Sequence, residues 1–144
     1  MNKKILIIFT SFFLSIFIFE SSEAKKSYYE AGKKLFSNKK YKEAKFYFEK
    51  DIVFNPKSEI SYLYLAKIFK KEKKNDLEEN NLNTVLLINP KNEEAIYLLT
   101  LLNIKNSDFS KAKELINTLN SICIKMCSSQ KELQSKLDNS LKSE

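Results

Sequence analysis

The sequence contains no histidine, no tryptophan and no arginine, so all 25 of its basic residues are lysines. The missing histidine removes the commonest general base and metal ligand. The missing arginine removes the planar side chain that binds a carboxylate or phosphate through two parallel hydrogen bonds. The acidic pairs Glu78–Glu79 and Glu93–Glu94 are interpreted as exposed helix charges. Neither an enzyme nor a cofactor-binding protein is therefore expected.

Glycine and proline are also scarce, with one Gly and two Pro in 144 residues. So few turn-forming residues indicate helices joined by short connections. The length suits one domain. An all-α fold is the prediction.

The N-terminus is typical of a signal peptide. Lys3 and Lys4 precede the apolar run from Ile5 to Phe19, and small residues at Ser22 and Ala24 fit cleavage before Lys25. The apolar run is shorter than the about 20 residues that a spanning helix needs. We therefore expect residues 1–24 to be removed and the protein to be exported, to the periplasm or cell envelope or beyond the cell. The alternative is that the segment stays attached as a membrane anchor.

Positive charge is concentrated near the start of the remaining chain. The whole sequence has a formal net charge of +7, and residues 25–58 carry ten Lys against four acids. Such a surface attracts nucleic acid in a salt-dependent way, but the export signal and the missing arginine argue against that partner. Membrane contact is expected only through the N-terminus or this basic segment, which is the first of the repeats described below.

A short motif recurs along the chain. Asn55-Pro56-Lys57 returns as Asn89-Pro90-Lys91. The interval from Pro56 to Pro90 matches the fixed period of about 34 residues that is typical of one class of helical repeat array. The predicted repeats cover 25–58, 59–92 and 93–126.

Each repeat contains two apolar stripes at helical spacing, separated by a polar turn. In the first repeat the stripes are Tyr28, Ala31, Gly32 and Leu35, then Tyr41, Ala44, Phe48 and Ile52. The residues predicted to cap the following helices are Ser58, Asn75, Asn92 and Asp108. Pro56 and Pro90 stand where a second helix must stop.

This pattern resembles the tetratricopeptide repeat (TPR) family over about residues 25–124. The residues that carry the resemblance are Tyr28, Gly32, Tyr41, Ala44, Phe48 and Pro56, then Tyr62, Leu65, Ala66, Phe69 and Pro90, then Leu99, Phe109, Ala112 and Leu119. The small residues, such as Gly32 and Ala66, let one helix approach its partner closely. The resemblance implies an antiparallel helix-pair solenoid of about three TPR-like repeats.

Three positions depart from the family's pattern. Asn75 and Glu78 replace an aromatic and a small residue, which predicts a displaced or out-of-register second helix in the middle repeat. Ile124 replaces the closing proline, which predicts that the last helix of the third repeat runs on.

Residues 127–144 are predicted to form a C-terminal capping helix, because the end of a solenoid needs a cover. Ser129 and Glu132 have the spacing of a capping box. Leu133, Leu137 and Leu141 follow as a narrow apolar seam. The alternatives are a partner-binding helix and a frayed one.

Cys123 and Cys127 are four residues apart. Packed free thiols, a local disulfide and a metal or redox role are the alternatives. An oxidising compartment permits the disulfide, whereas a regular helix would not aim the two side chains well at each other. No further Cys or His completes a metal site.

The resemblance also implies a groove lined by the first helix of each repeat. The predicted groove residues are Tyr29, Lys33, Phe36, Leu63, Lys67, Lys70, Tyr97 and Leu101. Lysines among aromatic rings suit an extended or helical peptide with acidic and apolar groups. The alternative is that these lysines are simply solvated.

One ligand class of the family is not expected. Members that clamp a C-terminal carboxylate use Lys, Asn and Arg at set groove positions, and here those positions hold Tyr29, Lys33, Tyr64, Glu94 and Leu98. Only Lys33 keeps a basic side chain, so recognition of an acidic chaperone tail is not predicted.

The sequence thus predicts a non-catalytic adaptor or scaffold of the cell envelope that binds another protein in its groove. The competing prediction is a membrane-tethered structural protein whose basic first repeat contacts anionic lipid. A secreted effector that acts on a host protein is a third alternative. Three repeats are near the minimum for stability, so self-association is a further expectation.

Overall fold

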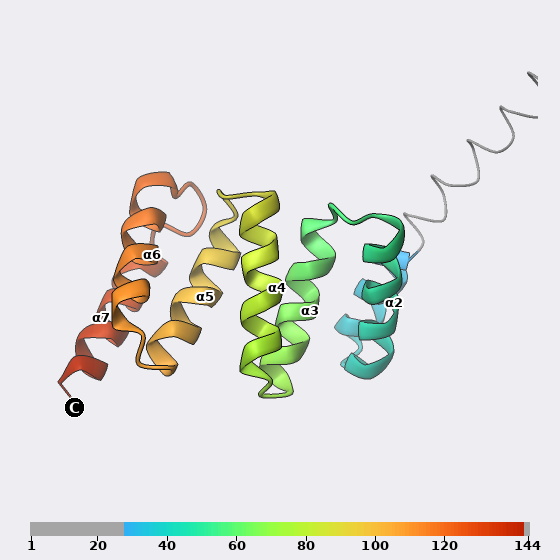
Figure 1. The fold of residues 1–144 in the computed structure, drawn as a ribbon, viewed down its shortest axis with the longest axis horizontal. Helices are drawn as coiled ribbons and strands as arrows, with labels where there is room; N and C mark the ends of the chain where they lie inside the picture. Colours follow the sequence, from blue (N-terminus) through green and yellow to red (C-terminus); the bar gives the residue numbers. More distant parts are fainter. Residues whose placement is uncertain (1–27, 143–144) are drawn as a thin grey trace, which may run out of the picture. The chain divides into compact units, whose positions relative to one another are not determined.

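The structure, a computed structural model, describes residues 28–142, and within them helices are the only regular secondary structure. Residues 28–37 are helical, and the elements that follow are α2 (Tyr41–Phe54), α3 (Glu59–Lys71), α4 (Asn75–Ile88), α5 (Glu93–Lys105), α6 (Phe109–Ile122) and α7 (Ser129–Leu141). Figure 1 shows α3 and α4, and then α5 and α6, as antiparallel pairs. The predicted all-α helix-pair fold is confirmed. The predicted signal peptide and its cleavage site lie outside the described residues.

The helices repeat at the predicted interval. α2, α4 and α6 begin at Tyr41, Asn75 and Phe109, at the same spacing as the two prolines, and α3 and α5 are related by this spacing too. The predicted displacement of the middle repeat's second helix is therefore wrong. Asn75 accepts a hydrogen bond from Lys105 Nζ at 2.9 Å and donates one to Asn106 at 3.2 Å, so its side chain joins the start of α4 to the end of α5.

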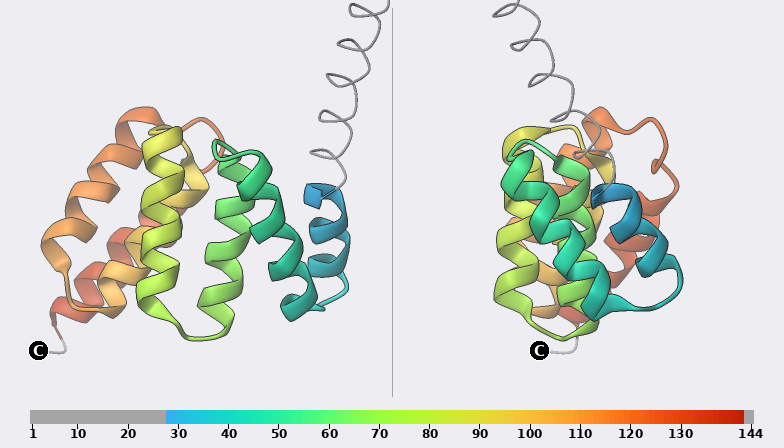
Figure 2. Two further views of the ribbon diagram at one scale, coloured as in Figure 1. Left: turned by 45° about the vertical axis from the view of Figure 1, so that its right-hand side comes forward. Right: turned by 90° about the vertical axis from the view of Figure 1, so that its right-hand side faces the viewer.

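The described residues divide into two compact units, with the boundary between Pro56 and Lys57. In the first, the helix at 28–37 runs antiparallel to α2 (Figure 2). Ala44 and Phe48 are fully buried, and a Cβ atom added to Gly32 would lie 2.9 Å from the Phe48 ring. A close approach of the two helices is therefore what requires glycine at this position.

The second unit contains two apolar clusters. One lies among α3, α4 and α5 and is built from Leu63, Ala66, Leu82, Val85, Ala95, Leu99 and Leu102. The other lies among α5, α6 and α7 and is built from Ile96, Ile104, Ala112, Ile116, Leu119, Leu133 and Leu137. Each helix pair thus supplies side chains to the cluster that it shares with the next element.

The turns inside the helix pairs share one backbone conformation. Lys39, Lys73 and Ser107 have φ of 61°, 58° and 58°, in the left-handed region, and occupy equivalent positions of successive repeats. Two of the predicted helix caps are confirmed, because Asn92 accepts from the Ala95 N–H and Asp108 from the Lys111 N–H. Ser58 does hold the N-cap position of α3 but its side chain makes no capping hydrogen bond, and the prediction for Asn75 is wrong.

Ser58 bonds the Ser61 hydroxyl instead of a free backbone N–H group. Asn75 is itself the first residue of α4, and Lys74 precedes it. The Ser58 contact is local, whereas the Asn75 contacts join residues that lie 30 and 31 positions apart in the sequence.

The C-terminal helix covers the end of the second unit. Leu133 and Leu137 of α7 are 0% and 2% exposed, whereas Leu141 is 51% exposed and takes no part in the predicted seam. The predicted capping box is also wrong, because α7 begins after Ser128 and Glu132 accepts a hydrogen bond from the Tyr97 hydroxyl instead. Among residues 28–142, no helix has the length and apolar character needed to cross a membrane.

Candidate interaction surface

In the first unit, the predicted groove residues Tyr29, Lys33 and Phe36 lie on one helix. The Tyr29 ring is 6.4 Å from the Phe48 ring, and Phe36 packs edge-on against Tyr41 at 5.3 Å. Lys33 is exposed, and its ammonium lies 5.8 Å from the centre of the Tyr29 ring. Both aromatic side chains thus contribute to packing against α2, and Lys33 extends over one of them.

In the second unit, a charged pair joins the first helices of two successive repeats. Lys67 of α3 forms an ion pair with Glu94 of α5 at 2.7 Å, and the Lys67 and Glu94 side chains are 23% and 45% exposed. The same ammonium lies 5.0 Å from the centre of the Tyr64 ring. The contact places a cation, a carboxylate and an aromatic ring at one place on the surface.

Tyr97 extends this surface to α7. Its hydroxyl donates to the Glu132 carboxylate, at 3.2 Å to one oxygen and 3.3 Å to the other. Burial, the hydrogen bond to Glu132 and the charge of Glu132 all raise the pKa of Tyr97. Leu101 is partly buried and packs on the cluster shared by α5, α6 and α7. We call the surface formed by Tyr64, Lys67, Glu94, Tyr97 and Glu132 the α3–α5–α7 face.

One predicted groove residue of α3 lies in the core, and another affects the charge of α4. Leu63 is 2% exposed and belongs to the core cluster among α3, α4 and α5, so its assignment to the groove is wrong. It shares this cluster with the small residues Ala66 and Ala95. Lys70 is exposed, and its charge acts on Glu78 of α4.

Glu78 occupies the position that Ala44 and Ala112 hold in the other repeats. It is 3% exposed, so its interpretation as an exposed helix charge is wrong. Burial raises the pKa of this carboxyl, and the charges of Lys70 and Lys105 partly offset the rise. The two lysines allow a carboxylate to occupy a position that favours a small apolar residue.

Glu93 of α5 holds the loop between α6 and α7. Its carboxylate accepts hydrogen bonds from the backbone N–H groups of Ile124 at 2.8 Å, Lys125 at 3.0 and 3.2 Å, and Met126 at 2.6 Å. Desolvation opposes ionisation, but these bonds and the charge of Lys125 outweigh it and lower the pKa of Glu93. The interpretation of Glu93 as an exposed helix charge is therefore wrong.

The same loop is closed by a disulfide between Cys123 and Cys127, whose Cα atoms are 5.2 Å apart. Of the three alternatives for this pair, the structure contains the local disulfide. α6 ends at Ile122, so the predicted extension of this helix is wrong. Because the cysteines lie in a loop, the geometry of a regular helix does not hinder their pairing.

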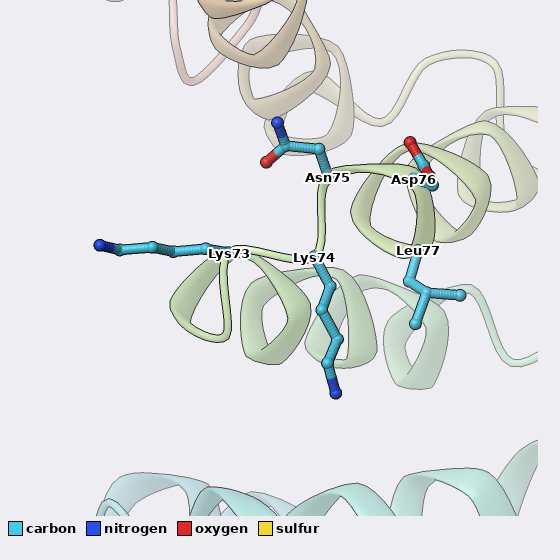
Figure 3. Close-up of a pocket in the computed structure, with 5 residues that line it drawn as sticks. All are labelled: Lys73, Lys74, Asn75, Asp76 and Leu77. Atoms are coloured by element: carbon cyan, nitrogen blue, oxygen red, sulfur yellow. The ribbon is translucent and has the colours of Figure 1, made fainter.

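Among the hollows of the described surface, two lie near these features. One lies beside Glu93 and Glu94 at the starts of α3 and α5, and its other lining residues are Glu59, Asn89, Lys91, Asn92, Lys125 and Met126. The other, at the turn from α3 to α4, is lined by residues 73–77. Figure 3 shows the Lys73, Lys74 and Asn75 side chains pointing in different directions, so they do not converge on a ligand.

The described residues offer little for metal chemistry. Between residues 28 and 142, no group of three His, Cys, Asp or Glu side chains is arranged to hold a metal ion. What the α3–α5–α7 face does offer is a set of ring surfaces, charges and hydrogen-bonding groups suited to contact with a polypeptide.

Comparison with known proteins relates the chain to others by fold. No protein-family profile matches the sequence. No curated protein sequence matches it either. Solved structures do match.

The TPR domain of Arabidopsis OM64 superposes with a TM-score of 0.74 at 17% identity, over 83% of this chain and 98% of that one. The first TPR of Spaghetti (RPAP3), bound to the HSP90 peptide SRMEEVD, gives 0.74 at 20% identity, over 84% and 95%. The Yersinia enterocolitica type III secretion chaperone SycD, in complex with a peptide of the translocator YopD, gives 0.72 at 14% identity, over 83% and 94%.

These likenesses extend over most of this chain and nearly all of each matched domain. They agree with the constant interval between equivalent helices of the chain. The chain therefore has the fold of tetratricopeptide repeat domains.

Proposed function

We propose that the protein is a non-catalytic adaptor that binds a segment of another protein on the α3–α5–α7 face. The observation that carries the proposal is the Lys67–Glu94 ion pair at 2.7 Å, with the Tyr64 ring beside it. Partly exposed charges and a ring from the first helices of two successive repeats meet there on one surface. Solved domains of the same fold hold peptides of HSP90 and of YopD, which supports a peptide as the ligand.

The charges of the face define the kind of segment that fits. Tyr64 and Tyr97 offer ring surface and Lys67 a cation, but Glu94 and Glu132 add two carboxylates. A purely acidic tail would meet those carboxylates at close range and be repelled. The face therefore suits an extended or helical segment with apolar side chains and charges of both signs.

A pull-down from an envelope fraction tests this proposal. The purified protein is cross-linked to the proteins that it binds in the fraction, and the amount of partner recovered with it is measured. The variant Tyr64→Ala/Lys67→Ala removes the ring and the cation, and should reduce recovery of the partner about tenfold, as loss of a few interface contacts does. Asn83→Ala/Leu87→Ala changes two exposed residues of α4 and is the matched control. Equal recovery with both variants would reject the α3–α5–α7 face as the binding surface.

We further propose that the protein is exported and works in the cell envelope. The N-terminal sequence pattern supports this proposal. N-terminal sequencing of the exported protein should begin at Lys25. A chain that starts at Met1, stays in the membrane fraction and binds anionic liposomes would instead support the tethered alternative.

A further inference from the structure

The loop between α6 and α7 is a small closed ring. The disulfide joins Cys123 to Cys127 across a separation of four residues. Residues 124, 125 and 126 lie between them, and their backbone N–H groups all donate to Glu93. Successive N–H groups arranged in this way form a concavity that binds an anion.

The ring and the carboxylate depend on each other. The three N–H groups converge on one carboxylate only while the loop stays curled, and the disulfide holds its ends at a Cα separation of 5.2 Å. Glu93 comes from the first turn of α5, 31 to 33 residues away in the sequence. The ring is therefore attached to the body of the second unit through this side chain.

α7 follows the ring after one residue. Gln130 of α7 donates to the Cys123 sulfur at 2.8 Å. Close by on the same helix, Glu132 holds the Tyr97 hydroxyl on the α3–α5–α7 face. A continuous set of contacts thus leads from the disulfide through the start of α7 to that face.

We propose that the disulfide and Glu93 form a thiol-controlled latch that holds the start of α7 against α5, and with it Tyr97. Closing the ring presents the three N–H groups to Glu93 and restricts where the start of α7 can lie relative to α5. Opening it lets the loop leave the carboxylate and loosens the contact between Glu132 and Tyr97. The effect on partner binding rests on the proposed function, whereas the latch itself does not.

The chemical step is thiol–disulfide exchange with a dithiol. One thiolate of the dithiol attacks a sulfur of the Cys123–Cys127 pair, forming a mixed disulfide and releasing the other cysteine as a thiolate. The second thiol of the reagent then displaces the remaining cysteine. The protein gains two electrons and two protons as two thiols, and the dithiol becomes a disulfide.

Hydrogen exchange of the full-length protein, oxidised and after reduction by dithiothreitol, tests the latch. We expect the amides of Ile124, Lys125 and Met126 to exchange roughly tenfold faster after reduction, the factor that loss of one hydrogen bond to a charged group gives. The amides of the first turn of α7 should also exchange faster. The oxidised variant Glu93→Gln should show the same pattern without reduction, because an amide accepts these bonds less strongly than a carboxylate.

Glu94→Gln is the matched control, since it removes a neighbouring carboxylate that pairs with Lys67, whereas the backbone N–H groups of the loop donate to Glu93. It should leave the exchange of the loop unchanged. Exchange that is the same before and after reduction would overturn the latch. So would full thiol labelling of protein prepared without reductant, or equal effects of the two glutamate variants. Failure to capture a partner would reject the proposed function and leave these exchange results untouched.

Discussion

At the scale of single residues, Gly32 shows how closely the helix at 28–37 approaches α2. A Cβ atom there would lie 2.9 to 3.1 Å from three atoms of the Phe48 ring, and Phe48 is fully buried. Overpacking of this kind costs about 1–3 kcal/mol, while alanine gains about 1 kcal/mol over glycine in a helix. We therefore predict that Gly32→Ala lowers stability by up to about 2 kcal/mol in urea unfolding.

A double-mutant cycle checks the cause. In a Phe48→Leu background the ring is absent, so Gly32→Ala should be neutral or stabilising. The same loss in both backgrounds would show that the contact with Phe48 is not the reason for glycine.

Glu78 is a second case at this scale. Its pKa in the folded protein is raised above 4.5, so the folded state binds the proton more tightly than the unfolded state does. The ionised side chain therefore destabilises the fold at neutral pH, and this penalty disappears as the pH falls through the raised pKa towards 4.5. We predict that Glu78→Gln raises the melting temperature at pH 7 by on the order of a few degrees.

The gain should shrink in melting curves recorded at lower pH. Glu79→Gln, on the same helix, is the control and should change the melting temperature less. A Glu78→Gln variant that is less stable than wild type at pH 7 would show that the carboxylate is held by Lys70 and Lys105 more strongly than burial disfavours it.

At the scale of elements, α7 is packed through Leu133 and Leu137, whereas its last residue, Leu141, lies at the surface. Leu137 is 2% exposed and Leu141 is 51% exposed, although both belong to the same stripe of the sequence. Leu137→Ala should destabilise the protein by about 2–5 kcal/mol, because it leaves a cavity in a packed cluster. Leu141→Ala should stay within about 0.5 kcal/mol of wild type. Similar losses for the two variants, measured by thermal unfolding, would mean that α7 packs along its whole length.

The boundaries of the elements show what the sequence predicts well. The local signals recur at the interval from Pro56 to Pro90, and the helices recur at the same interval. The end of α6 is not predicted in this way, because contacts with distant residues shape the loop that follows it. No proline follows α6, and it ends at Ile122, where the disulfide and Glu93 shape the loop. The contacts of Glu93 join residues that lie far apart in the sequence, which periodicity does not reveal.

At the scale of the whole molecule, the resemblance predicted a lysine-rich groove, and the second unit brings only some of the predicted residues to one surface. Lys67 and Tyr97 lie on the α3–α5–α7 face, but each is engaged by a carboxylate, Glu94 or Glu132. Leu63 turns inward although it is equivalent to Tyr97 in the next repeat. Position in the repeat indicates which helix a side chain comes from, whereas its neighbours decide whether it is free to bind.

The central claim is that a partner segment lies on the α3–α5–α7 face, and site-specific photo-crosslinking in the producing cells tests it most directly. A benzophenone amino acid in place of Tyr64 would stand beside Lys67, and the same group in place of Leu87 would stand on α4, where the native side chain is 84% exposed. We predict a discrete adduct with one partner from position 64 and none from position 87. An adduct from position 87 alone, or the same adduct from both positions, would contradict the claim.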